Sequence, residues 1–159
     1  MVDKEKIVGF SRPFGPALLK VKLPEAIIND FNQDCLDINN NKKEKIDYSD
    51  HLVGNVEEEY LISKDILVKY AGWFSEASGK YLHPNPEDYE KNKHKFKIGI
   101  ARGWYVRQFD GDFNPVHQHT ECQLSCIGFL KLPDDINELW KEEDKDHNPS
   151  AGYINFIYG

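Results

Sequence analysis

Two histidines stand one residue apart in the segment GDFNPVHQHTEC, and an acid follows two residues after the second histidine. Side chains two residues apart in a β-strand point to the same face, so His117, His119 and Glu121 would project together from one strand. Two imidazoles and one carboxylate are the ligands with which non-haem iron proteins hold Fe(II) while leaving coordination positions open. The types and the spacing of these residues therefore make them candidate ligands of one metal ion.

A second interpretation of the pair stays open, because a His-x-His sequence also occurs by chance at the end of a strand without any metal. The surroundings favour a site. The pair follows a Gly-Asp-Phe-Asn-Pro turn and precedes a stretch that is apolar on both faces, as at the mouth of a barrel or a sandwich. The other four histidines fall in predicted loops, from which any of them could complete a coordination sphere: His51, His83, His94 and His147.

Two cysteines and an arginine near the pair have simpler interpretations. Cys122 and Cys126 lie four residues apart, but no second cysteine pair exists to complete a zinc site, so we expect two thiols in the core. Arg102 interrupts the apolar face of a predicted strand at 96–106. It either anchors a buried carboxylate or lies at a sheet edge, and we expect the sheet edge.

The composition is that of a globular protein, with 40% hydrophobic and 13% aromatic residues, and 159 residues are enough for a single domain over 1–159. A net charge of −7 argues against nucleic acid as a partner, since phosphate binding needs a clustered basic surface. The segment MVDKEKIVGF is charged and lacks a long apolar run, so we expect no secretory signal and no membrane span. An odd number of cysteines, three, makes no disulfide framework, and a cytoplasmic location is expected.

Hydrophobic periodicity divides the chain into a helical first part, residues 1–94, and a strand-rich second part, residues 95–159. The first part is expected to hold an irregular start at 6–16, an edge strand at 17–23, a helix from Pro24 to the NNNKK stretch, a loop at 47–59, a helix at 62–79 and a loop at 83–94. The second part is expected to hold strands at 96–106, 115–121 and 123–131, a short helix at 134–141 and a last strand at 152–159. The order predicts an α+β fold. The acidic run at 57–59 is expected to face solvent.

The stretch GWYVRQFDGDFNPVHQHTECQLSCIGFLKLP resembles the 2-oxoglutarate/Fe(II)-dependent oxygenases of marine phages and bacteria. That family combines a tryptophan strand, an Asn-Pro-x-His-x-His turn and a serine-containing strand that leads to a Leu-x-x-Pro sequence. The positions that fit are Trp104, Gln108, Asn114, Pro115, His117, His119, Ser125, Leu130 and Pro133. Upstream, SRPFGPALLKVKLPEAIINDFN and DYSDHLVGNVEEEY resemble the family's first strand, first helix and Leu-x-Gly loop, and GYINFIYG resembles a later strand.

The resemblance implies a double-stranded β-helix, or jelly roll, flanked by N-terminal helices. It implies a dioxygenase that hydroxylates a small-molecule or peptide substrate, with Fe(II) and 2-oxoglutarate as cofactors. His117 and His119 would then bind the metal, with Glu121 in reserve. Asn114, Arg102 and Tyr105 are the expected cofactor-binding residues.

The sequence departs from the family after the last predicted strand. The family places a distal histidine and an arginine on later strands, and residues 152–159 contain neither. We therefore expect a chain that lacks its last strands, is inactive by itself and forms a homo-oligomer through open sheet edges. Two alternatives remain: a cupin-like jelly roll that binds a metal or a small molecule without oxygenase turnover, and a barrel that serves only for assembly.

Overall fold

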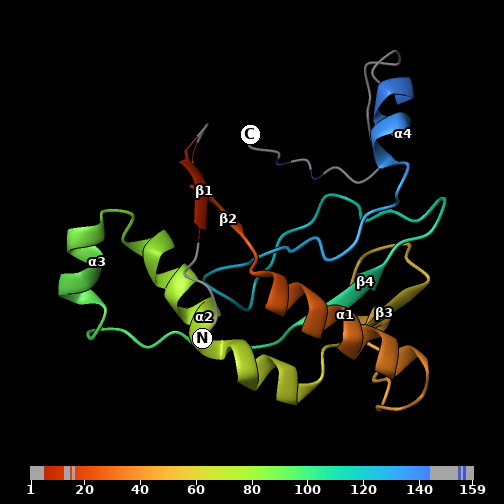
Figure 1. Ribbon diagram of the computed structural model, residues 1–159, viewed down its shortest axis with the longest axis horizontal. Helices are drawn as coiled ribbons and strands as arrows, with labels where there is room; N and C mark the ends of the chain where they lie inside the picture. The colour runs from red at the N-terminus through yellow and green to blue at the C-terminus, as the bar shows by residue number, and fades with distance from the viewer. Residues whose placement is uncertain (1–5, 13–14, 16, 144–153, 155, 157–159) are drawn as a thin grey trace. The chain divides into compact units, whose positions relative to one another are not determined.

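The computed structural model describes residues 6–12, 15, 17–143, 154 and 156 (Figure 1). The chain divides into two compact units, residues 1–126 and 127–159. The described elements of the first unit are β1 (Lys6–Ser11), β2 (Leu18–Lys22), α1 (Glu25–Asn39), the 3-10 turn η1 (Ser49–His51), β3 (Glu58–Leu61), α2 (Lys64–Leu82), α3 (Pro86–Asn92) and β4 (Trp104–Arg107). The second unit contains α4 (Ile136–Glu143). Four helices and two antiparallel two-stranded sheets, β1–β2 and β3–β4, confirm the α+β class for the described residues.

The predicted jelly roll is not seen in the part of the chain that the structure describes. The strands expected at 115–121 and 123–131 are wrong, because the backbone there forms no strand. An alternating apolar pattern becomes a strand only where another strand satisfies its N–H and C=O groups. Apolar side chains in this stretch, such as Val116 and Ile127, are exposed instead. The last predicted strand, 152–159, falls outside the described residues except for two positions that are not in a strand.

The strand predicted at 96–106 is reduced to β4, since its first part packs on α2. The ring of Phe96 stacks on His83 with the centroids 5.3 Å apart. Further along, the carbonyl oxygen of Gly103 accepts a hydrogen bond of 3.1 Å from the backbone N–H of Ile62, just before α2. Phe96 thus lies beside the end of α2, and Gly103 is bonded to a residue just before α2, before the chain enters β4.

Three predicted irregular segments contain regular structure. The expected loop at 47–59 holds η1 and the first two residues of β3. The expected irregular start holds β1, which pairs antiparallel with β2. The expected loop at 83–94 holds α3, whose first residue is Pro86. The side chain of Asn85 accepts hydrogen bonds from the N–H groups of Glu87 (2.9 Å) and Asp88 (3.4 Å). An asparagine cap followed by proline is a helix-start signal that outweighs the missing periodicity in so short a helix.

Helix α1 forms where it was predicted, and its apolar stripe supplies much of the core of the first unit. Pro24 precedes the helix and Glu25 lies in its first turn, both favourable at that end. The buried positions recur at helical spacing: Ile27, Phe31, Asp34 and Ile38. Helix α2 also forms as expected and runs three residues past the predicted end at Gly79. None of the described helices is long and apolar enough to cross a membrane.

The β3–β4 sheet packs one of its two faces on α1. Tyr60 and Tyr105 lie opposite one another in the register and are both buried. The hydroxyl of Tyr60 accepts a hydrogen bond of 2.7 Å from the side chain of Asn39. The hydroxyl of Tyr105 lies 3.0 Å from the carbonyl oxygen of Phe31 and 2.9 Å from Asp34 Oδ2. Because side chains alternate along a strand, the neighbours of these tyrosines must project from the opposite face.

Asp34 is the buried charge of this interface, with 2% of its surface exposed. Its carboxylate accepts hydrogen bonds from Lys43 Nζ (2.7 Å), the backbone N–H of Ser63 (3.2 Å) and the phenol of Tyr105 (2.9 Å). Burial by itself would raise the pKa of Asp34, but these hydrogen bonds outweigh it and hold the pKa below its ordinary value of 3.8. A carboxylate with three donors thus ties α1 to β4 and to the start of α2.

Replacing Asp34 by asparagine should lower the free energy of unfolding at neutral pH by about 2 kcal/mol, the usual cost of losing charge-assisted hydrogen bonds. A folded-state pKa below the unfolded value stabilises the protein above pH 4 and loses this effect as pH falls through the folded pKa. Urea unfolding at a series of pH values should therefore show a difference between the two proteins that shrinks below pH 4. Asp37→Asn, on a more exposed side of α1, should change little, and equal losses in both variants would contradict the buried-charge account.

Candidate functional site

The face of the β3–β4 sheet that points away from α1 is called here the Trp104 face, and it consists of Glu59, Leu61, Trp104 and Val106. The segment before η1 extends this face along the free edge of β3. Tyr48 donates its backbone N–H to the carbonyl oxygen of Glu59 (3.0 Å), and Asp47 forms a single bridge with Tyr60. This register places the side chain of Tyr48 on the Trp104 face, opposite Glu59.

Aromatic rings on the Trp104 face connect η1 to the predicted metal-binding segment. The ring centroids of His51 and Tyr48 are 4.7 Å apart, and those of Tyr48 and Trp104 are 5.6 Å apart. Trp104 in turn lies 5.8 Å from His119. The indole of Trp104 is therefore the surface on which the His-x-His segment rests.

The two predicted metal ligands lie side by side, although they are not in a strand. Their ring centroids are 5.1 Å apart and their planes meet at 76°. Nδ1 of His117 lies 2.8 Å from the carbonyl oxygen of Pro115. A carbonyl oxygen only accepts, so Nδ1 carries a proton, and in the neutral imidazole Nε2 is then the nitrogen with a free lone pair. Both histidines are exposed, and the pair can therefore be reached from solvent.

Arg102 and Glu121 also meet on this side of the sheet. One guanidinium nitrogen of Arg102 donates to the hydroxyl of Tyr48 (2.6 Å), and the other donates to Glu121 Oε2 (2.7 Å). The side chain of Glu121 is 72% exposed and that of Arg102 is 48% exposed. Arg102 thus lies just before β4 and pairs with an exposed carboxylate. It does not anchor a buried carboxylate, which was the other interpretation.

Two of the predicted cofactor-binding residues lie away from this cluster. Tyr105 projects to the opposite face of the sheet and is engaged by α1. Asn114 lies against Gly54, where an added Cβ would meet its side-chain oxygen at 2.2 Å. The neighbouring residues Asn55 and Phe113 exchange two backbone hydrogen bonds, of 2.8 and 3.1 Å. Gly54 and Asn114 therefore hold the loop before the histidine pair against the loop before β3.

Glu59 is the functional candidate that the sequence analysis missed. The acidic run 57–59 was expected to face solvent, yet Glu59 is only 4% exposed and its Oε1 is buried without a hydrogen-bond partner. Burial, together with the negative charges of Asp47 and Asp112, raises the pKa of this carboxyl above its ordinary value. Strand alternation with Leu61 was the signal that could have found it, because the two residues share one face.

The other cysteines and histidines do not gather around the pair. Cys122 and Cys126 are free and exposed, so the expectation of core thiols is wrong. Their segment lacks the sheet that would have covered them. His83 stacks on Phe96, His94 is exposed, and His147 lies outside the described residues. Within the described ranges no three His, Cys, Asp or Glu side chains are arranged to hold a metal ion.

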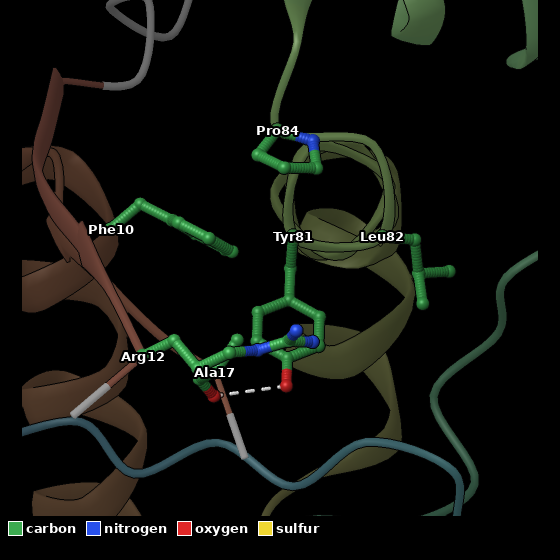
Figure 2. Close-up of a pocket in the computed structure, with 6 residues that line it drawn as sticks. All are labelled: Phe10, Arg12, Ala17, Tyr81, Leu82 and Pro84. Carbon is green, nitrogen blue, oxygen red and sulfur yellow. Dashed lines mark hydrogen bonds between the residues drawn. The ribbon is translucent and has the colours of Figure 1, made fainter. Parts of the chain in front are cut away.

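A separate cavity of about 520 Å³ lies between the β1–β2 hairpin and the end of α2 (Figure 2). Its lining is mostly apolar: Phe10, Arg12, Ala17, Tyr81, Leu82 and Pro84. The phenol of Tyr81 donates to the carbonyl oxygen of Ala17 (2.9 Å) across it. None of the predicted site residues lines this cavity.

Comparison of the chain with protein-family models, with curated proteins and with solved structures finds no match. The chemistry of the cluster must therefore be argued from its own geometry. The cluster combines two accessible imidazoles, an exposed arginine–carboxylate pair, an aromatic surface and a buried acid. Such a set can bind a transition metal and an anionic or cationic organic molecule next to it.

Replacing Gly54 by alanine should lower the free energy of unfolding by about 1–3 kcal/mol, because the new methyl group overlaps neighbouring atoms. The oxygen of Asn114 lies 2.2 Å and a methyl group of Val56 lies 3.0 Å from the position of the added carbon. Gly99→Ala is the matched control, since nothing lies within 4 Å of its added carbon. Urea unfolding of both variants measures the difference. Equal stability would mean that Asn114 does not rest on Gly54.

Proposed function

We propose that the chain is an Fe(II)- and 2-oxoglutarate-dependent oxygenase domain in which His117 and His119 bind the metal. The observation that carries the proposal is the paired arrangement of the two imidazoles, with His117 Nδ1 held by the carbonyl oxygen of Pro115. A metal-binding histidine typically has its second ring nitrogen tied to a backbone carbonyl or a carboxylate in this way. The resemblance of the motif to the oxygenases supplies the identity of the metal and of the co-substrate.

The donor set fits Fe(II) in two of the three positions of a facial site. Among the described residues no third ligand stands with the pair, and Glu121 is the nearest acid in the sequence. Its exposed ion pair with Arg102 contributes at most about 1 kcal/mol, so a metal ion can draw the carboxylate away at small cost. When bound, Fe(II) would activate O2, the oxidant for hydroxylation, and 2-oxoglutarate would supply two electrons through its oxidative decarboxylation.

Arg102 is the residue that we propose for binding a carboxylate of 2-oxoglutarate. A planar guanidinium is well suited to a carboxylate, and Glu121 already occupies it in this way at 2.7 Å. Exchange of Glu121 for the co-substrate would preserve the hydrogen bonds of the guanidinium and release Glu121 toward the metal. The hydroxyl of Tyr48 accepts from the other guanidinium nitrogen and keeps it beside the Trp104 face.

A second candidate function is metal or small-molecule binding without oxygenase turnover. The observation that favours it is the missing third ligand, because the described residues bring together two imidazoles and leave Glu121 paired with Arg102. The oxygenase and the metal-binding form of the second candidate both place a metal at the histidine pair. They differ in whether 2-oxoglutarate joins it.

Of the histidines that the structure describes, only His117 and His119 should be required for metal binding. Isothermal titration of the protein with Fe(II) under anaerobic conditions should show one site per chain, weakened by at least about 10-fold in His117→Ala and in His119→Ala, since each removes a ligand. His94→Ala is the control, an exposed histidine outside the cluster that should leave the affinity unchanged. Unchanged affinity in the two alanine variants of the pair would reject the metal site.

2-Oxoglutarate should join the metal through Arg102. Adding it to the anaerobic Fe(II) protein should produce the visible metal-to-ligand charge-transfer band of the chelate, and Arg102→Gln should raise the concentration of 2-oxoglutarate required by at least about 10-fold, because a charge-assisted pair is lost. Lys20→Gln, which removes the same charge from an exposed position in β2, is the control for charge. Metal uptake without the band would reject the oxygenase and leave the second candidate.

A further inference from the structure

Glu59 is the one buried carboxyl of the described cluster that no part of the proposed chemistry uses. Buried polar atoms in folded proteins nearly always have a hydrogen-bond partner, so an exception requires an explanation. Oε1 of Glu59 is buried without a partner, while the whole residue is 4% exposed. A ligand that donates a hydrogen bond would supply what the protein does not.

The position of Glu59 places this acid among aromatic rings. In the register, Glu59 pairs with Val106 on one side and faces Tyr48 on the other, while Trp104 lies two pairs further along, on the same face. The rings of Tyr48 and Trp104 come from the two segments that flank β3, and their centroids are 5.6 Å apart. They meet on the face of the sheet from which Glu59 projects. Aromatic faces attract cations, and a carboxylate beside them adds to that attraction.

The charges around Glu59 also favour a cation. Asp47 and Asp112 stand near enough to oppose its ionisation. The cations of the neighbouring strands are engaged elsewhere: Lys45 and Arg107 both pair with Glu58, on the opposite face. Arg102 is held by Tyr48 and Glu121. Within the described ranges no cation forms an ion pair with Glu59, so a bound cation would meet no competing partner there.

We infer that Glu59 binds a protonated amine and that the substrate of the proposed site carries such a group. The assignment of the bound amine as substrate rests on the proposed oxygenase function; the binding of the amine does not. An ammonium group would donate to Oε1 and lie against the rings of Tyr48 and Trp104. The ammonium group and the carboxylate form hydrogen bonds and an ion pair, and no covalent bond changes. A metal ion is a poorer occupant, because the described acids do not form a three-ligand group.

Access to Glu59 requires a covering side chain to move. Tyr48 faces it across the strands and belongs to the segment between α1 and β3, which has only η1 as regular structure. Its phenol is held from outside by Arg102. A temporary turn of this ring away from β3 would admit the amine, and its return would place the ring against the bound ammonium group. The face that packs on α1 takes no part in this movement.

The test uses the metal-free protein with n-butylammonium as the probe and 1-butanol as its uncharged counterpart. Nuclear magnetic resonance of the Trp104 indole N–H should show saturable binding of n-butylammonium at neutral pH, at least 10-fold tighter than that of 1-butanol. The Glu59→Gln variant should bind n-butylammonium at least about 10-fold more weakly than the unmodified protein, because the charge-assisted pair is lost. Its affinity for 1-butanol should not change. Glu58→Gln, with the same change of charge on the opposite face, should bind n-butylammonium within 2-fold of the unmodified protein.

Titration calorimetry at a series of pH values adds a second readout. The affinity of the unmodified protein for n-butylammonium should fall as the pH is lowered, because protonation of Glu59 removes the carboxylate charge, and the affinity of Glu59→Gln should not change. Equal affinities for n-butylammonium and 1-butanol, measured on the unmodified chain and therefore independent of any variant's folding, would overturn the inference. So would an unweakened Glu59→Gln. Failure of the metal titration alone would reject the oxygenase and leave the amine site standing.

Discussion

The phenol of Tyr105 is where the β3–β4 sheet is anchored to the helical part of the first unit. Its oxygen meets the backbone of Phe31 and the carboxylate of Asp34, both on α1. Burial raises the pKa of this phenol well above its ordinary value, with the hydrogen bond to Asp34 as the next cause, so it stays a neutral donor. A tyrosine held in this way decides which side of β4 faces the core. Every other side chain of the short strand is oriented as a consequence.

The orientation of Tyr105 determines which side chains form the candidate site, because its strand neighbours must project from the opposite face of the sheet. Trp104 precedes the anchored tyrosine and must point away from α1, where it becomes the contact surface for Tyr48 and His119. Arg102, two residues earlier, binds Tyr48 and Glu121 on the same side. A strand of four residues thus separates a structural face, satisfied by hydrogen bonds, from a face with an exposed ion pair and a buried acid that lacks a partner. Native proteins concentrate such unsatisfied groups where ligands bind.

Local sequence patterns predicted the elements whose start and apolar spacing are encoded within the element itself. Helix α1 has a helical apolar stripe and a proline at its start, and both signals are local. The strands expected at 115–121 and 123–131 failed because a strand depends on a partner, which a pattern in one segment cannot supply. At 96–103 the same alternation forms no strand, and Phe96 stacks on His83 at the end of α2. Helix α3 was missed although its asparagine cap and proline were visible, because seven residues are too few to show a period.

The sequence by itself determined which residues of the chain are chemically reactive or able to bind a metal. It determined that two imidazoles lie close in the chain, at 117 and 119. It also determined the α+β class, through helical spacing in the first part and alternation around β4. Only the tertiary structure decided that Arg102 meets Glu121, that Tyr105 faces the core and that Glu59 is buried. The physical reason is that these outcomes depend on contacts between segments 19 to 74 residues apart or on which face of a strand is covered. An acid in a run of three glutamates looks solvated until its strand neighbours are known.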